Sequence, residues 1–254
     1  MSLFTAQPQR LILDDGTTLA YHHVTGDRPG VLFLGGFTSD MTGVKATTLE
    51  AWCRARGQAF LRFDYSGHGA SSGAFVEGTI GGWAQQALAV LDQLTAGPQL
   101  LVGSSMGAWL MLLIALARPE RIVGLLGLAC AVDFTRYLLW ERLDPSLQER
   151  LRRERVISLP SPYGETYLIT LKLIEEARQH NLLDRPELAI HVPVRLIHGM
   201  ADADVPWRIS IAVAEKLHGA DVRVLLVKDG EHTLSRDQDL RLLTQTLAEL
   251  LDRR

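Results

Sequence analysis

Three polar side chains of this sequence could together activate a hydroxyl group. Ser105 lies at the centre of a G-x-S-x-G pattern, and Asp202 and His232 follow it along the chain. A serine hydroxyl is a weak nucleophile near neutral pH, so it needs a base to accept its proton and a third group to hold that base in the right tautomer. Serine, acid and histidine in this order, each after a strand, are typical of acyl transfer through a covalent acyl-serine.

The surroundings of the G-x-S-x-G pattern matter more than the pattern itself, because most such matches are ordinary turns. Apolar residues 98–102 predict a strand before it, and apolar residues 108–117 predict a buried helix after it. A strand, a sharp turn and a helix project the serine from the apex of the turn, above the positive end of the helix. We therefore predict that Ser105 is the nucleophile and Ser104 a bystander.

The base and the acid are sought in loops after predicted strands, because open α/β sheets place their sites at the carboxyl ends of strands. His232 follows the strand predicted at 222–227, which favours it as the base. Asp202 and Asp204 both follow the strand predicted at 194–197. Asp202 lies in the middle of its loop, whereas Asp204 stands where the next helix begins and could cap it. We favour Asp202 as the acid and keep Asp204 as the alternative.

The tetrahedral intermediate of acyl transfer carries an oxyanion that needs backbone N–H donors. We predict one donor in the amide of Met106, directly after the nucleophile. The other is predicted in the amide of Phe37, which follows the strand expected at 31–34. Gly35 and Gly36 precede Phe37 and would let the backbone pass close to a substrate.

Other conspicuous residues receive structural interpretations. His198 adjoins a glycine on an apolar strand, where a histidine is more often packed and hydrogen-bonded than catalytic. The glycine-rich stretch 64–69 predicts a turn near the site, in which Asp64 bonds its own loop. The arginine-rich stretch 150–155 predicts a solvated face, with contact to an anionic substrate as the alternative.

Composition limits the classes of protein that this chain can be. Its 254 residues are 47% hydrophobic and 22% charged, so they can bury a sizeable core. A net charge of −3 argues against a nucleic-acid surface. The apolar stretch 95–117 is interrupted by a proline and glycines, which predicts a buried strand and helix rather than a transmembrane segment. Two cysteines without a disulfide-like spacing, and an N-terminus without a secretory pattern, predict a cytoplasmic protein.

Short apolar strands alternate with helices along the chain, which predicts a mostly parallel sheet covered on both faces. The expected strands lie at 11–13, 19–24, 31–34, 59–63, 98–102, 122–131, 194–197 and 222–227, and the expected helices at 43–56, 79–94, 108–117, 207–217 and 240–251. Residues 133–188 interrupt this alternation with two helix-like pieces, 144–153 and 164–180. We therefore expect a hydrolase core in two parts, 1–132 and 189–254, with a helical lid inserted between them.

Several motifs resemble those of the α/β-hydrolase superfamily, and within it those of the mitochondrial palmitoyl-protein thioesterase and mycophenolic acid acyl-glucuronide esterase family. The likeness covers most of the chain and is weakest in the expected lid. It rests on residues 36–46, 62–69, 97–107 with 109–112, and 198–202 with 205–207. Ala108 departs from the pattern, where a second glycine is expected. A transit extension is not seen at the N-terminus, so we keep the expectation of a cytoplasmic location.

The resemblance implies an α/β-hydrolase fold with an eight-stranded, mostly parallel sheet, and it gives Ser105, Asp202 and His232 the roles of nucleophile, acid and base. It implies hydrolysis of carboxylic esters or thioesters, on a small molecule or an acylated protein, without a metal or an organic cofactor. The alternatives are another reaction of this fold, on a lactone, a C–C bond or a peptide, and a ligand-binding protein that does not catalyse.

Overall fold

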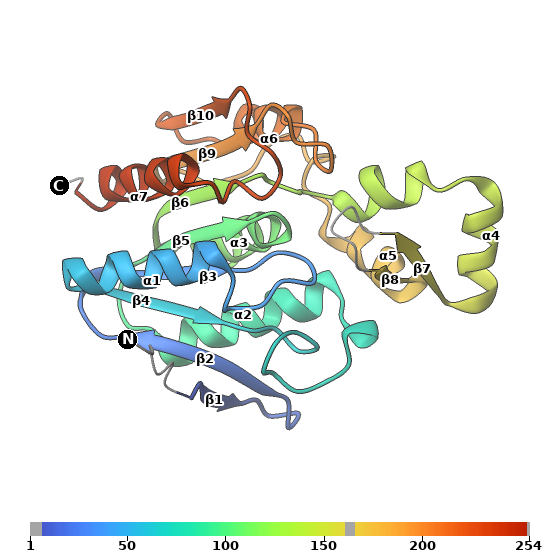
Figure 1. Ribbon diagram of the computed structural model, residues 1–254, viewed down its shortest axis with the longest axis horizontal. Coiled ribbons are helices and arrows are strands. Elements are labelled where there is room, and N and C mark those ends of the chain that lie inside the picture. The colour runs from blue at the N-terminus through green and yellow to red at the C-terminus, as the bar shows by residue number, and fades with distance from the viewer. Residues whose placement is uncertain (1–6, 161–165, 253–254) are drawn as a thin grey trace.

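The computed structural model describes residues 7–160 and 166–252 of the chain. Eight strands form one mixed sheet in the order β1-β2-β4-β3-β5-β6-β9-β10 (Figure 1). The pairs β1–β2 and β2–β4 are antiparallel, and every following pair across the sheet is parallel. The strands are β1 (Gln9–Ile12), β2 (Thr18–Val24), β3 (Asp27–Leu34), β4 (Gln58–Phe63), β5 (Gln99–Ser104), β6 (Ile122–Leu128), β9 (Val194–Gly199) and β10 (Val222–Val227). The prediction of an eight-stranded, mostly parallel sheet is confirmed.

Helices cover both faces of the sheet, as the alternation of elements predicts. On one face α1 (Val44–Arg56) packs beside α7 (Asp237–Leu251), as Figure 1 shows. The other face is covered by α2 (Ile80–Leu94), α3 (Met106–Ala117) and α6 (Arg208–Lys216). Apolar residues surround α3 on all sides, because this helix lies in the middle of the core and presents almost no face to solvent.

The described residues between β6 and β9, 129–160 and 166–193, lie outside the sheet as an insertion. In Figure 1 it extends as a lobe to one side of the sheet. It contains a π-helical turn (Thr135–Leu139), α4 (Pro145–Glu154), β7 (Val156–Pro160), β8 (Thr166–Thr170) and α5 (Leu171–Ala177).

The insertion is only partly helical, which corrects the expectation of a helix over 164–180. The first part of that range is strand β8, which pairs antiparallel with β7, and the expected start at residue 164 lies outside the described residues. Thr166, Tyr167 and Ile169 are β-branched or aromatic, and such side chains favour a pleated surface when a partner strand is available. The apolar spacing of a short segment does not distinguish the two structures.

Two carboxylates hold the insertion in place: the buried Asp133 joins its two ends, and the half-buried Glu176 joins it to the core. Asp133, at its start, has a positive φ of 54° and accepts hydrogen bonds from the amides of Leu182 and Leu183, near its end. Burial raises the pKa of Asp133 to about 6, although these two amides act in the opposite direction. Glu176 of α5 accepts a hydrogen bond from the amide of Gly81 in the first turn of α2. The lobe is therefore held at its base by charge-assisted hydrogen bonds.

Two glycines allow α3 to approach the strands closely at the start of the helix. A Cβ on Gly107 would lie 2.1 Å from the carbonyl oxygen of Leu34, and one on Gly103 would lie 2.5 Å from the carbonyl oxygen of Gly107. Backbone atoms cannot move aside as a flexible side chain can. This close packing fixes where β5 ends and α3 begins.

We predict that Gly107→Ala destabilises the protein by about 2 kcal/mol or more, because the steric clash exceeds the ~1 kcal/mol that alanine gains in a helix. Gly35→Ala is the matched control, since a Cβ there meets nothing within 4 Å. Urea unfolding of both purified variants measures the difference. Equal midpoints for the two variants would show that the close approach does not restrict the turn.

Candidate active site

The turn between β5 and α3 holds Ser105 in a conformation that few residues adopt. Its φ of 56° and ψ of −119° lie outside the regions that suit an L-residue. The turn is held from behind, because the Ser105 amide donates to the carbonyl of Leu128 over 2.8 Å. Such strain persists only where the surrounding structure enforces it, and here it projects the hydroxyl from the end of the strand.

The structure brings Ser105, His232 and Asp202 together in one hydrogen-bonded series. The distance from His232 Nε2 to Ser105 Oγ is 3.0 Å, and the distance from His232 Nδ1 to Asp202 Oδ2 is 2.8 Å. The three residues follow β5, β10 and β9 respectively, at the carboxyl ends of these strands. The arrangement allows the hydroxyl to donate to an imidazole whose other nitrogen is held by a carboxylate.

The carboxylate of Asp202 is completely buried and accepts four hydrogen bonds. Oδ1 accepts from the amides of Asp204 and Val205, at 2.9 and 2.8 Å. Oδ2 faces His232 at 2.8 Å and His198 at 3.1 Å. Burial alone would raise the pKa of the Asp202 carboxyl, but the hydrogen bonds from the two histidines outweigh it and hold the pKa well below its usual range. Asp202 is therefore an anion.

Asp204, the alternative acid, has a different position. Its amide supports Asp202, and its side chain lines the pocket in front of Ser105. Among the described residues, Asp202, Asp204 and His232 also form the one group of three whose donor atoms lie close enough for a metal ion, within 4.8 Å of one another. Asp202 and His232 already form a hydrogen bond with each other, between Oδ2 and Nδ1.

The backbone predicted to receive the oxyanion lies beside the serine. A Cβ on Gly36 would be 3.3 Å from Ser105 Cβ, so the loop after β3 passes directly over the nucleophile. Phe37 and Met106 both line the pocket. The Phe37 amide donates to no acceptor among the described parts of the chain, which leaves it available to a bound oxygen.

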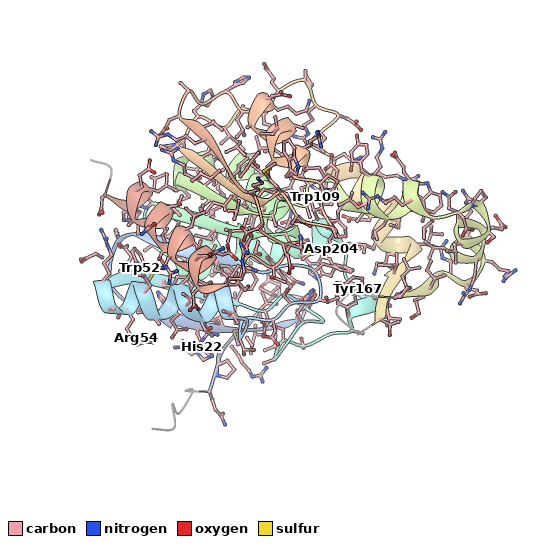
Figure 2. The ribbon with its side chains drawn as sticks, turned by 45° about the horizontal axis from the view of Figure 1, so that its top comes forward. His22, Trp52, Arg54, Trp109, Tyr167 and Asp204 are labelled. Atoms are coloured by element: carbon pink, nitrogen blue, oxygen red, sulfur yellow. The ribbon has the colours of Figure 1, made fainter. Side chains whose placement is uncertain are left out.

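A pocket of about 450 Å³ opens in front of Ser105, a size typical of sites for small organic ligands. Its far wall comes from the insertion, through the apolar or aromatic residues Phe134, Leu138, Leu139, Leu159 and Tyr167. The Phe37 ring joins the two walls, with centroids 5.4 Å from Phe134 and 5.9 Å from Tyr167. Figure 2 labels Tyr167 and Asp204 near the junction of the core and the insertion.

Two cations that the sequence analysis did not identify line the same pocket. Lys45 donates from Nζ to the carbonyl of Thr233, directly after His232. Burial lowers the pKa of Lys45 to about 8, although Asp239 attracts its charge. Arg142 reaches the pocket from the insertion. A lysine in the first turn of a helix opposes the helix dipole, and this signal in the sequence could have indicated Lys45.

The remaining residues named from the sequence lie outside the hydrogen-bonded series of Ser105. Asp64 accepts from the amide of Ala70 in its own loop and from that of Met41, which follows the loop over the serine. The arginines of 150–155 lie on or next to α4, and Arg150 pairs with Glu154 on the surface of the lobe. His198 is packed and hydrogen-bonded, yet its partner is Asp202.

Known proteins of similar sequence and structure agree with this fold. A model of the alpha/beta hydrolase family matches residues 19–252. The mitochondrial palmitoyl-protein thioesterase ABHD10 of Homo sapiens is 42% identical over 241 residues, which cover 94% of this chain and 78% of that protein. The solved structure of alpha/beta hydrolase domain-containing protein 10 from mouse is 40% identical, with a TM-score of 0.90 and coverage of 97% of this chain and 99% of that one. A putative hydrolase from Agrobacterium vitis S4 is 34% identical, with a TM-score of 0.92 and the same coverage.

The expectation of a cytoplasmic location is wrong by this comparison. The curated relatives from human, mouse and cattle are all named as mitochondrial proteins. The expectation rested on what the first residues of the sequence lack, and where a sequence begins does not report the location of the protein. In the described part of the chain, no helix combines the length and the apolar character that a membrane span requires.

The geometry predicts that Asp202→Asn lowers kcat by about 10⁴-fold, because an amide would hold the imidazole in the wrong tautomer. Asp204→Asn is the matched control and should keep most of the activity, since the backbone of Asp204 is what supports the acid. Steady-state hydrolysis of a chromogenic ester by the purified variants measures both effects. A larger loss in Asp204→Asn than in Asp202→Asn would give the role of the acid to Asp204.

Proposed function

Because the chain belongs to the alpha/beta hydrolase family, we propose that Ser105, His232 and Asp202 are its nucleophile, base and acid. The protein is an ABHD10-like serine hydrolase of carboxylic esters or thioesters. One observation carries the assignment of residues: His232 lies within hydrogen-bond distance of both Ser105 and Asp202, through different ring nitrogens. This geometry lets the imidazole accept the serine proton while its other nitrogen remains held.

The reaction proceeds in two halves. His232 Nε2 takes the proton of Ser105 as Oγ attacks the acyl carbonyl, and the amides of Phe37 and Met106 stabilise the oxyanion. The tetrahedral intermediate collapses to an acyl-serine, and His232 gives its proton to the departing alcohol or thiol. A water molecule, deprotonated by His232, then attacks the acyl-serine. The carboxylic acid is released as His232 returns the proton to Ser105 Oγ. Throughout, the ionised Asp202 stabilises the positive charge that forms on the imidazole.

The substrate that we propose is a long-chain acyl thioester on a protein cysteine. The relatives that are about 42% identical are named palmitoyl-protein thioesterases. The apolar wall contributed by the insertion supports an acyl chain as occupant, because it lies directly across from the nucleophile and would bury methylene groups. In this proposal the insertion serves as a lid over the acyl chain.

Labelling with a fluorophosphonate tests the nucleophile. The probe should modify Ser105 and no other serine, because Ser105 has an imidazole beside it and also lines the pocket. Ser210 also bonds an imidazole, that of His198, but its side chain is completely buried. Ser105→Ala should remain folded, lose labelling, and lose nearly all turnover. Mass spectrometry of the labelled peptide identifies the position, and circular dichroism of the variant controls for folding. Labelling at another residue, or near-native turnover by folded Ser105→Ala, would refute the assignment.

A series of acyl thioesters from acetyl to palmitoyl tests the acyl site. We expect kcat/KM to rise with chain length, since each added methylene that enters the apolar wall contributes up to ~0.8 kcal/mol. Leu159→Trp should move the optimum to shorter chains by filling this space. Leu168→Trp is the control, because Leu168 belongs to the same hairpin but is exposed and does not line the pocket. Indifference of the native enzyme to chain length would count against an acyl groove.

A further inference from the structure

We propose that His198 and Ser210 form a second arm that positions the acid: the Nε2–H of His198 holds Asp202 Oδ2 in place for His232. This inference rests on the proposed function, because it gives these residues a part in the same reaction. His198 contacts neither Ser105 nor the pocket, so it acts through Asp202 as a positioning residue. From the sequence, His198 was predicted to be a packed, hydrogen-bonded residue without a part in catalysis.

The contacts of His198 use both of its ring nitrogens. Its side chain is completely buried at the end of β9. Nε2 lies 3.1 Å from Asp202 Oδ2 and 3.0 Å from the carbonyl oxygen of Val205, and Nδ1 lies 2.7 Å from the hydroxyl of Ser210 in α6. Ser210 is also completely buried. One imidazole thus connects the loop of the acid to the helix that follows it.

The direction of each hydrogen bond follows from the chemistry of the partners. A carboxylate and a backbone carbonyl can only accept, so Nε2 of His198 must carry a proton. In the neutral imidazole Nδ1 then accepts, and the hydroxyl of Ser210 donates to it. Cys130, in the same part of the core, has a buried thiol whose pKa burial raises to about 12, so this group adds no charge there. The donors therefore run in one sense from Ser210 through His198 to Asp202.

Two donor series converge on a single oxygen. Ser105 donates to His232 and His232 to Asp202 Oδ2 from the side of the pocket, while Ser210 and His198 lead to the same oxygen from the core. The other oxygen, Oδ1, is held by two backbone amides of its own loop. The arm through His198 is therefore the one contact, among the described residues, that restrains Oδ2 without taking part in proton transfer.

A buried carboxylate needs this support for two reasons. Its charge is costly to bury, and each donor offsets part of the cost. It must also present Oδ2 to His232 at a fixed angle, because a small displacement of a positioning group lowers the rate of a catalysed step. His198 and His232 both hydrogen-bond Asp202 Oδ2, and the bond from His198 weakens the attraction between this oxygen and His232. Without His198, Asp202 should therefore stabilise the protonated form of His232 more strongly.

Replacement of His198 by the two amide side chains separates positioning from packing. In His198→Gln the amide nitrogen can occupy the place of Nε2 and donate to Asp202. In His198→Asn it falls near the place of Nδ1, so the shorter chain keeps Ser210 but loses Asp202. We expect His198→Asn to lower kcat by about 10- to 100-fold with KM little changed, and His198→Gln to restore most of this loss.

The pH profile of kcat/KM gives a readout that packing alone would not move. In His198→Asn its acid limb should shift to higher pH, because the base must lose its proton beside a carboxylate that attracts it more strongly. The other charged or titratable groups that line the pocket beside His232 are Asp204, Lys45, Arg142 and Tyr167, and every variant keeps them. Ser210→Ala should shift the limb in the same direction by a smaller amount.

Urea unfolding of each variant corrects the rates for the fraction of folded enzyme. Equal kcat in folded His198→Asn and His198→Gln, with native pH profiles, would overturn the inference. If neither variant folds, a native kcat and pH profile in Ser210→Ala would overturn it. The activity of Ser105→Ala distinguishes failure of this inference from failure of the proposed function. If Ser105→Ala is fully active, the proposed function is refuted. If Ser105→Ala is inactive and His198→Asn behaves as the native enzyme does, only the role of His198 and Ser210 is refuted.

Discussion

The buried negative charge of Asp202 is the constraint on which the rest of the site depends. A carboxylate without exposure to water must receive hydrogen bonds on both oxygens, and here they come from its own loop, from β9 and from the loop after β10. These donors outweigh the cost of burial and keep the group ionised. Because the donors come from separate segments, the charge also fixes the positions of those segments relative to one another. The hydrogen bonds that the buried Asp202 carboxylate needs therefore also hold these segments together at the carboxyl edge of the sheet.

The position of Ser105, the proposed nucleophile, depends on steric packing rather than on charge. Ser105 occupies a strained turn because β5 and α3 approach each other more closely than any side chain at Gly103 would allow. Backbone contacts of this kind leave little freedom, so the hydroxyl stays within reach of His232 without a flexible loop to place it. His232, the proposed base, lies on a loop whose next residue, Thr233, is held through its carbonyl by Lys45. In the proposed reaction His232 must give a proton first to the departing alcohol or thiol and then to Ser105, so both side chains have to stay in place through the two halves.

The insertion contributes the part of the pocket that the core does not build. Its base is tied down by the carboxylates of Asp133 and Glu176, while its hairpin and π-helical turn supply the apolar wall opposite Ser105. The proposed catalytic residues thus lie at the edge of the sheet, whereas the insertion shapes the space in which the substrate would bind. A change in the lobe can therefore alter which acyl group is accepted without moving the nucleophile.

Local patterns in the sequence determined the strands and helices of the core, the strained turn at Ser105 and the order of serine, acid and histidine, because burial and backbone geometry leave marks on neighbouring residues. They did not determine the β7–β8 hairpin, the place of Lys45 or the contact of His198 with Asp202, since each depends on a partner from another element. The preference for Asp202 over Asp204 was likewise only a preference, until the structure showed which carboxylate faces His232. Ser105 and His232 are 127 residues apart, and nothing local to either can encode a distance of 3.0 Å between their side chains. Only the tertiary structure decides such distances, because it sets the register of the parallel strands whose carboxyl ends meet at this edge.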